Sequence, residues 1–281
     1  MSGVMERTLG ILELLSQHAE GLELAVIADR LNMPRSAAHR LLTDLTGAGY
    51  VRQRREHGDY SLTTKLVALG LQYLGQSGVI DLSQPLLDRL AESCGELVRL
   101  SVIDGERLTW IAKAQGARQG LRYDPDMGSD ARLSCSASGL AWMASMSDDD
   151  ALAMISRQGL GQPEHYGPNA PRTIKQVLAM LNAARKRGYS VTVDTYTSGL
   201  SAMAAIVTPA NGAPIGVITV AGPTARFTEA RMAALAPELL SACQQMAAAS
   251  GAAPFFRKSS SRSSPEPTTN RTRTRAPSHV A

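Results

Sequence analysis

Apolar residues recur at helical spacing in three successive stretches of the first fifty positions. A stripe of leucines over 4–16 predicts a first helix, and a second stripe over 24–31 predicts a short helix after a break at Gly21. Residues 32–34 supply a turn, and Pro34 suits the first position of a third helix, where its missing N–H costs nothing. That helix is expected to end at Gly47 and Gly49. The residues on its inward face are expected to be Ala38, Leu41, Leu42 and Leu45.

The pattern then changes to the alternation of strands. Residues 50–54 and 60–62 predict a hairpin whose turn, 56–59, is rich in residues that tolerate unusual φ angles. Two helices joined by a tight turn, a third helix and a basic hairpin are typical of a winged helix-turn-helix. Such a module lays one helix in the DNA major groove.

The remaining chain mixes strands with helices, which predicts an α+β second domain. A helix over about 65–74 leads to a hinge at 75–78, and Asp81 is expected to cap the helix that follows, to about Glu92. Strands are expected over 97–103, 108–114, 189–194, 202–207 and 215–221, and helices over 137–145, 148–158, 174–187 and, after a Thr228 cap, to about 249.

These elements predict four regions. Residues 1–64 form the winged helix-turn-helix DNA-binding domain, 65–78 a linker helix and hinge, 79–250 an effector-binding domain, and 251–281 a disordered basic tail. The tail is predicted from its Ser, Thr, Pro and Arg content, which offers few residues able to build a core.

Composition supports a globular, two-domain protein: 281 residues, 44% apolar and 19% charged. No apolar run is long enough to span a bilayer, and the N-terminus resembles an amphipathic helix rather than a secretory signal, so we expect a cytoplasmic protein with no membrane partner. The net charge of +4 comes from the tail, which carries about +5 from 254 onward. Overall basicity therefore does not by itself argue for DNA binding by the folded part.

The sequence contains no motif that is typical of a cofactor or metal site. The three cysteines, Cys94, Cys135 and Cys243, are far apart, and they are expected to be reduced, buried thiols. No phosphate-binding loop, dinucleotide fingerprint or metal-ligand spacing occurs, so we expect no cofactor and no metal.

The candidate DNA contacts are the polar residues left on the outside of the third helix and the arginines of the hairpin. The hairpin offers neither an apolar face nor paired acids, which favours phosphate contacts over an ordinary solvated surface. Ser36 and Arg40 are the candidates for base reading. The full set is Arg35, Ser36, His39, Arg40, Thr43, Arg52, Arg54 and Arg55. The basic tail is either a non-specific clamp on DNA or an extension without function.

Several motifs together resemble the IclR family of bacterial transcriptional regulators. They are the segment from RTLGILELL to TTKLVALG, then RLSCSASGLAWMA, RKRGYSVTVDTYTSGLSAMAAIV and GVITVAGPTARFTEARMAALAPEL. The resemblance covers about 5–249. It implies a GAF-like effector-binding domain (an antiparallel sheet flanked by helices), a homodimer or homotetramer on a palindromic double-stranded DNA operator, and a small-molecule effector, usually an organic or aromatic acid.

The resemblance also implies an effector pocket. Family members often carry acids after the Gly-Tyr pair and a cysteine near Ala202, whereas this chain has Thr192, Val193 and Ala202 there. Trp142 is either a pocket wall or, more in keeping with a lone helical Trp, part of the core. Arg118, Arg122, Arg132 and Arg172 are candidates for pairing a carboxylate, or are surface arginines. The implied pocket residues are Ser136, Ala137, Ser138, Gly139, Thr192, Asp194, Ala202, Thr219 and Ala221.

The sequence thus predicts a ligand-responsive regulator of a catabolic operon for an organic or aromatic acid, with no catalytic residues. The alternative is a small-molecule hydrolase or binding protein with a vestigial DNA-binding head. Its nucleophile would come from 134–136 and its base would be His165. A third possibility is an architectural DNA-binding protein without an effector.

Overall fold

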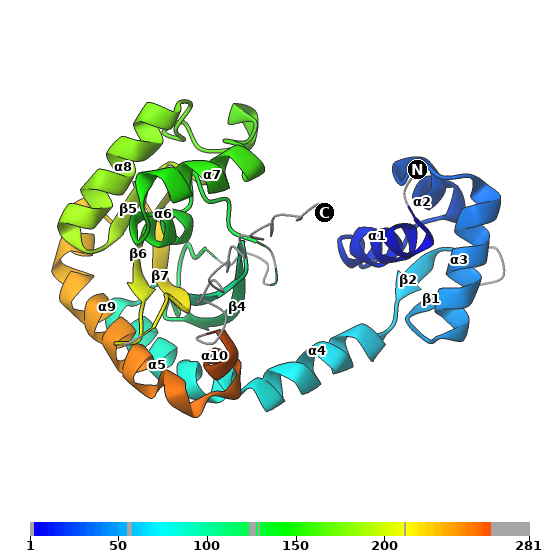
Figure 1. Ribbon diagram of the computed structural model, residues 1–281, viewed down its shortest axis with the longest axis horizontal. Helices are drawn as coiled ribbons and strands as arrows, with labels where there is room; N and C mark the ends of the chain where they lie inside the picture. Colours follow the sequence, from blue (N-terminus) through cyan, green and yellow to red (C-terminus); the bar gives the residue numbers. More distant parts are fainter. Residues whose placement is uncertain (1–2, 55–57, 124–127, 129, 211, 260–281) are drawn as a thin grey trace, which may run out of the picture. The chain divides into compact units, whose positions relative to one another are not determined.

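The computed structural model describes residues 3–54, 58–123, 128, 130–210 and 212–259. The chain divides into two compact units, Met1–Gln76 and Ser77–Ala281 (Figure 1).

The first unit is a small helical bundle with a two-stranded sheet. Its core joins the inward faces of three helices to the start of the hairpin, through residues such as Ile11, Ile27, Leu42 and Val51. Pro34 lies one position before the third helix, in extended conformation (φ −58°, ψ 140°), rather than at its first residue as expected. The elements are α1 (Val4–Ser16), α2 (Leu24–Arg30), α3 (Arg35–Gly47), β1 (Val51–Gln53), β2 (Tyr60–Leu62) and α4 (Thr64–Ser77).

The hairpin is anchored to the bundle, which corrects the prediction that it has no apolar face. Val51 and Tyr60 are buried in the core, and Tyr60 also forms a backbone bridge to Leu22. The chain reaches that bridge through Gly21, whose φ is +94° and where a Cβ would lie 2.9 Å from the Tyr60 carbonyl oxygen. Only glycine fits this turn without displacing backbone.

The second unit is built on a five-stranded antiparallel sheet in the order β4-β3-β7-β6-β5. Neighbours in sequence pair at both edges, while β7 lies between β3 and β6. The strands are β3 (Leu97–Asp104), β4 (Arg107–Gln115), β5 (Ser190–Val193), β6 (Leu200–Val207) and β7 (Gly216–Pro223).

Helices cover both faces of this sheet (Figure 1). Side chains at Val98, Leu100 and Val220 pack against α5 (Val79–Cys94) and α9 (Glu229–Ala249). Those of Trp110, Ala204 and Val217 face the opposite layer, and that layer contains α6 (Ala137–Ala144), α7 (Asp148–Gln158) and α8 (Ile174–Arg187). Short 3₁₀ turns occur at Pro163–His165 and Ser250–Ala252. The central strands are therefore buried on both sides, as their nearly continuous apolar sequences require.

The end of α4 and the start of α5 differ from the sequence prediction. Helix α4 continues through most of the expected hinge at 75–78, and Gly78, with φ +69°, separates it from α5. Gly78 is also the N-cap of α5, so Asp81 lies within its first turn instead of capping it. Thr228 does cap α9 as predicted, since its hydroxyl accepts a hydrogen bond from the Arg231 N–H.

The start of the expected disordered tail is helical, which corrects that prediction for 254–259. Helix α10 (Pro254–Ser259) holds Phe256, which is 4% exposed, in the same core as α5 and α9. The two consecutive phenylalanines supply the apolar area that the rest of the tail lacks. Residues 260–281 lie outside the described residues. Among those described, none of the helices combines the length and apolar content that a bilayer crossing requires.

Candidate nucleic-acid interface and effector site

The outer face of α3 is polar and fully available to a partner. Arg35, Ser36, His39, Arg40 and Thr43 are all exposed, because the helix buries the opposite side at Ala38, Leu41, Leu42 and Leu45. The Thr43 hydroxyl donates to the His39 carbonyl at 2.9 Å, which leaves its methyl group and lone pairs outward. Within the described part of the chain, neither Arg35 nor Arg40 forms a salt bridge.

The hairpin arginines are less free than the sequence suggests. Arg52 Nε donates to the Ser61 hydroxyl at 3.4 Å. Arg54 lies 3.6 Å from the Glu20 carboxylate, which corrects the expectation that the hairpin has no acidic partner. That pair is solvated, with side chains 45% and 94% exposed, so a phosphate can displace Glu20 at little cost. Arg55 lies outside the described residues.

In the second unit, the strand register produces a hollow over the sheet. Ala221, Ala202 and Thr192 lie side by side in one row across β7, β6 and β5. In a neighbouring row Thr219 pairs with Arg99 of β3. Small side chains in the first row leave space under the start of α6, and the hollow there has a volume of about 20 Å³.

Most of the residues expected in the effector pocket line this hollow. Gly139 and Asp194 do not: a Cβ on Gly139 would lie 2.4 Å from the Leu133 Cα, so this glycine allows close packing, and the Asp194 carboxylate accepts a hydrogen bond from the Gly199 N–H at 2.5 Å. The predicted members found in the lining are Ser136, Ala137, Ser138, Thr192, Ala202, Thr219 and Ala221.

Four further lining residues were missed from the sequence: Arg99, Trp110, Tyr196 and Leu200. Arg99 is only 5% exposed, and its guanidinium carbon lies 4.1 Å from the centre of the Trp110 ring. Burial lowers the pKa of Arg99, and the neighbouring Tyr123 offsets part of that lowering. The signal that could have found this residue is an arginine in the inward register of LVRLSV, an otherwise apolar strand.

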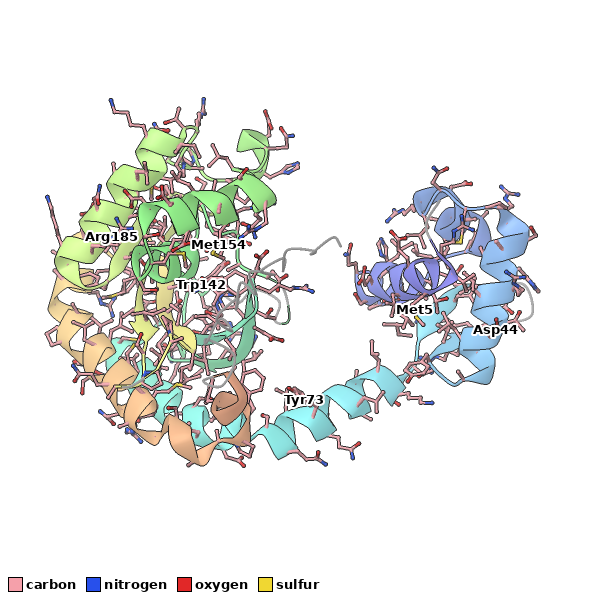
Figure 2. The ribbon with its side chains drawn as sticks, viewed as in Figure 1. Met5, Asp44, Tyr73, Trp142, Met154 and Arg185 are labelled. Atoms are coloured by element: carbon pink, nitrogen blue, oxygen red, sulfur yellow. The ribbon has the colours of Figure 1, made fainter. Side chains whose placement is uncertain are left out.

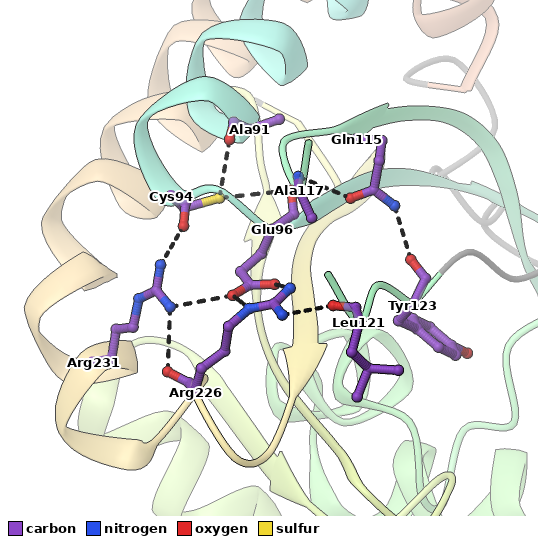
Figure 3. A network of polar contacts seen from close by, with 9 residues as sticks. All are labelled: Ala91, Cys94, Glu96, Gln115, Ala117, Leu121, Tyr123, Arg226 and Arg231. Carbon is purple, nitrogen blue, oxygen red and sulfur yellow. Dashed lines mark hydrogen bonds and ion pairs between the residues drawn. The ribbon is translucent and has the colours of Figure 1, made fainter. Parts of the chain in front are cut away.

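A second buried charge fixes the surrounding loop. The Glu96 carboxylate, 1% exposed, accepts hydrogen bonds from Arg226 at 2.7 and 2.9 Å and from Arg231 at 3.2 Å (Figure 3). The Arg226 pKa is raised, chiefly by its hydrogen bond to Glu96. Arg226 also donates to the Leu121 carbonyl at 2.6 Å, and Gln115 donates to the Tyr123 carbonyl at 2.9 Å. These bonds hold the segment that carries Tyr123, whose ring centre lies 5.8 Å from the Arg99 guanidinium.

The arginines proposed from the sequence as carboxylate partners do not line the hollow. Arg118 pairs with Glu92, and Arg132 donates to the Tyr166 hydroxyl and the Gln158 carbonyl. Arg122 and Arg172 are exposed. Trp142, labelled in Figure 2, is 6% exposed in the core between α6 and the sheet, as its alternative interpretation predicted.

The proposed nucleophile cluster lacks the features of an acyl-transfer site. Cys135 is buried, and burial raises its pKa to about 12, so the reactive thiolate is disfavoured. His165 is exposed on its 3₁₀ turn. All three cysteines are free and buried, as predicted. No group of three or more His, Cys, Asp or Glu side chains that suits a metal ion occurs within the described residues.

A winged helix-turn-helix with an exposed cationic helix, joined to an α+β unit that encloses a polar hollow, defines the class of ligand-responsive DNA-binding regulators. Comparison with known protein families identifies the family to which the chain belongs. Residues 4–55 match the IclR helix-turn-helix domain, and 71–248 match the C-terminal domain of the bacterial transcriptional regulator IclR. The chain therefore belongs to the IclR family of bacterial transcriptional regulators.

Individual relatives agree along nearly the whole chain. The acetate operon repressor of Salmonella typhimurium is 27% identical over 248 residues, which are 88% of this chain and 89% of that protein. An IclR regulator structure from Alicyclobacillus acidocaldarius superposes with a TM-score of 0.75 at 22% identity, covering 88% of this chain and 98% of the other. An IclR homologue from Microbacterium hydrocarbonoxydans, complexed with 4-hydroxybenzoate, gives a TM-score of 0.72 at 17% identity, covering 89% and 100%. These structural likenesses establish the fold.

Proposed function

We propose that this regulator controls a catabolic operon for an organic or aromatic acid, with 1–64 as its DNA-binding domain and 79–250 as its sensor. The observation that carries the proposal is the combination of an exposed cationic face on α3, which forms no salt bridge among the described residues, with a hollow in the other unit that is lined by the buried Arg99. The 4-hydroxybenzoate bound by the Microbacterium homologue supports an acid of this kind as effector. Reading a bacterial operator also implies that the protein works in the cytoplasm.

In this proposal, α3 lies in the major groove and the hairpin lies on the backbone. Arg40 and Ser36, one turn apart on the exposed face, read base edges. Arg35 lies at the start of the helix, where the positive end of the helix dipole adds to its attraction for phosphate. The remaining contacts to the backbone and groove come from His39, Thr43, Arg52, Arg54 and Arg55.

The hollow over the sheet binds the effector through the residues that line it. Binding shifts the population between two arrangements of the chain that differ in DNA affinity, which is the thermodynamic requirement for control by a ligand. We leave Gly139 and Asp194 out of the proposed lining, because the first packs against backbone and the second holds a turn.

The proposed assembly is a homodimer or homotetramer. Its support is the amount of apolar surface left open on the first unit: α1 and α4 expose several large side chains, including Met5 and Tyr73 (Figure 2). Surfaces of this kind on a single chain usually mark an interface. The exposed residues are Val4, Met5, Leu9, Leu66, Val67, Leu69, Leu71 and Tyr73.

We propose no enzymatic activity. A buried thiol whose pKa is about 12 and an exposed histidine do not favour the hydrolase alternative. An architectural role without an effector is disfavoured by three lining residues of the hollow, Arg99, Trp110 and Thr219, because each holds a buried polar atom without a hydrogen-bond partner, whereas buried polar groups are normally paired.

The test is fluorescence anisotropy with the DNA fragment upstream of the chain's own gene, against a scrambled fragment of equal length and composition. A regulator prefers its own fragment by about 10³-fold or more at physiological salt. Equal affinity for the two fragments, with or without candidate acids, would contradict the proposal.

A further inference from the structure

The hollow in the second unit contains three buried polar atoms that have no hydrogen-bond partner. They are Arg99 Nε, Trp110 Nε1 and Thr219 Oγ1, on residues that are 5%, 2% and 3% exposed. All three residues line the same hollow, although they come from three different strands. Among the described residues, these three are the only buried side-chain nitrogen or oxygen atoms left without a partner. Unsatisfied polar atoms are therefore confined to this hollow within the described part of the chain, and they are not scattered through the core.

Leaving these groups unsatisfied is costly. A buried donor without an acceptor loses its hydrogen bonds to water and gains none in the protein, and a buried charge is costlier still. The guanidinium of Arg99 stacks over the Trp110 ring at 4.1 Å, and this cation–π contact offsets part of the cost. This contact still leaves the Nε–H of Arg99 without an acceptor. Guanidinium stays protonated in proteins, so Arg99 cannot escape the cost by losing its charge.

No described acid neutralises Arg99. The salt bridges of the described residues involve other arginines. The two phenols beside it, Tyr123 and Tyr196, have pKa values raised mainly by burial, so both stay neutral at physiological pH. The hollow is thus a positive site lined by hydrogen-bond donors, and none of the described residues supplies an anion to it.

We propose that Arg99 is the anchor for the carboxylate of the effector, with the Thr219 hydroxyl and the Trp110 N–H as the two further donors. The proposal rests on the proposed function, because it assigns a ligand class and a specificity-determining residue to the same sensor unit. The site takes a small monocarboxylate. The negative charge pairs with the guanidinium, and two neutral donors remain for the second oxygen or a neighbouring hydroxyl or keto group.

The walls of the hollow limit the rest of the ligand. Ala137, Ala202, Ala221 and Leu200 form an apolar side, and Tyr196 meets Trp110 edge to face with ring centres 6.3 Å apart. The volume of about 20 Å³ is enough for one water molecule. Either acid therefore requires the lining to open: a keto acid of a few atoms requires less opening, and an aromatic acid requires the Tyr196 ring to move. The start of α6 adds the positive end of a helix dipole to the same side.

A thermal-shift titration tests the anchor. The probes are pyruvate and benzoate, each beside its uncharged amide, and the proteins are the wild-type chain, Arg99→Gln and the matched control Arg172→Gln, which removes an exposed arginine outside the hollow. A carboxylate at 100 times its Kd should raise the melting temperature of wild type and of Arg172→Gln by about 5–10 °C. The amides and Arg99→Gln should give no shift. Pyruvate and benzoate separate a short acid from an aromatic one, and a response to either supports the proposal.

A second measurement needs no ligand. Arg99→Met keeps most of the side-chain volume and removes the unpaired charge, so the ligand-free chain should melt higher, by about 2–4 °C. A lower melting temperature combined with no carboxylate shift would show that Arg99 is a structural residue and would overturn the proposal. Equal shifts in wild type and Arg99→Gln, or equal shifts with acid and amide, would overturn it as well. None of these results tests the preference for operator DNA. The proposal that Arg99 binds the carboxylate can therefore fail while the proposal that the chain is a DNA-binding regulator stands.

Discussion

Arginine residues occupy two contrasting environments in this chain. Arg40 is exposed on α3 and contributes nothing to the core, whereas Arg99 is buried beside Trp110 and has no acidic partner among the described residues. Exposed arginines on a helix were predictable because the helical period assigns each residue to a face. Arg99 was not predicted because charged side chains are rarely buried, although the alternation of its strand gives it an inward position.

Arg40→Ala should weaken binding to the operator by about 1–3 kcal/mol, or roughly 5- to 150-fold, because a side chain that reads a base edge contributes that much. The melting temperature should stay unchanged, since the side chain is exposed. Anisotropy titrations give the affinity. Lys175→Ala, which removes an exposed charge on α8, is the control; an equal loss there would mean that only net charge matters.

The buried thiols give a pH prediction. Burial raises the pKa of Cys94 to about 11 and those of Cys135 and Cys243 to about 12, above the ordinary value of 9.0. Because the folded-state values are the higher ones, this part of the stability is fully present below pH 9 and declines as pH rises above it. Iodoacetamide at pH 8 should therefore leave the folded chain unmodified and label all three cysteines after denaturation. Rapid labelling of the native protein would contradict the buried positions.

At the scale of helices and strands, periodicity predicted most elements to within a residue or two. Helices α1, α7, α8 and α9 begin and end where their apolar stripes do. The errors concern positions that local sequence does not determine. Asp81 has a side chain suited to capping, but the left-handed Gly78 ends the preceding helix and takes the N-cap itself. The buried face of the hairpin depends on Tyr60 meeting a core from distant helices.

Helix α10 is the clearest element-scale test, because composition alone predicted disorder there. Phe256→Ala should lower the free energy of unfolding by about 3–5 kcal/mol, the usual cost of deleting a buried phenyl ring. Phe255 is only half-buried, so Phe255→Ala should lower the free energy of unfolding by less. Denaturant unfolding measures both. Equal and negligible losses would mean that α10 does not belong to the core.

Helix α4 offers a test of assembly. Leu71 is 64% exposed on a helix whose apolar side chains lie open. If this surface holds two copies together, Leu71→Glu should shift the mass measured by light scattering toward the single chain, because an unpaired carboxylate is costly in an apolar interface. Gln72→Glu, at a neighbouring exposed position, adds the same charge and should leave the mass unchanged if it lies outside the interface. An unaltered mass for Leu71→Glu would place the interface elsewhere.

At the scale of the whole molecule, the two units combine a reader of DNA with a sensor of small molecules. The resemblance to IclR regulators predicted this order and most of the hollow's lining, because strand register repeats within a fold. It could not supply the residue that meets the ligand's charge. The expected acids and cysteine are absent, and Thr192 and Ala202 occupy their places. Arg99 comes from β3, a strand to which the sequence analysis assigned no pocket residue.

The most direct measurement is the affinity of the full chain for its own upstream fragment at about 150 mM salt, with and without the carboxylate that stabilises it. The account predicts a preference over scrambled DNA and a change of about 5- to 150-fold when the acid binds, the usual range of allosteric coupling. It further predicts that Arg99→Gln loses this response while Arg172→Gln keeps it. An affinity for the fragment that is indifferent to both sequence and acid would contradict the account.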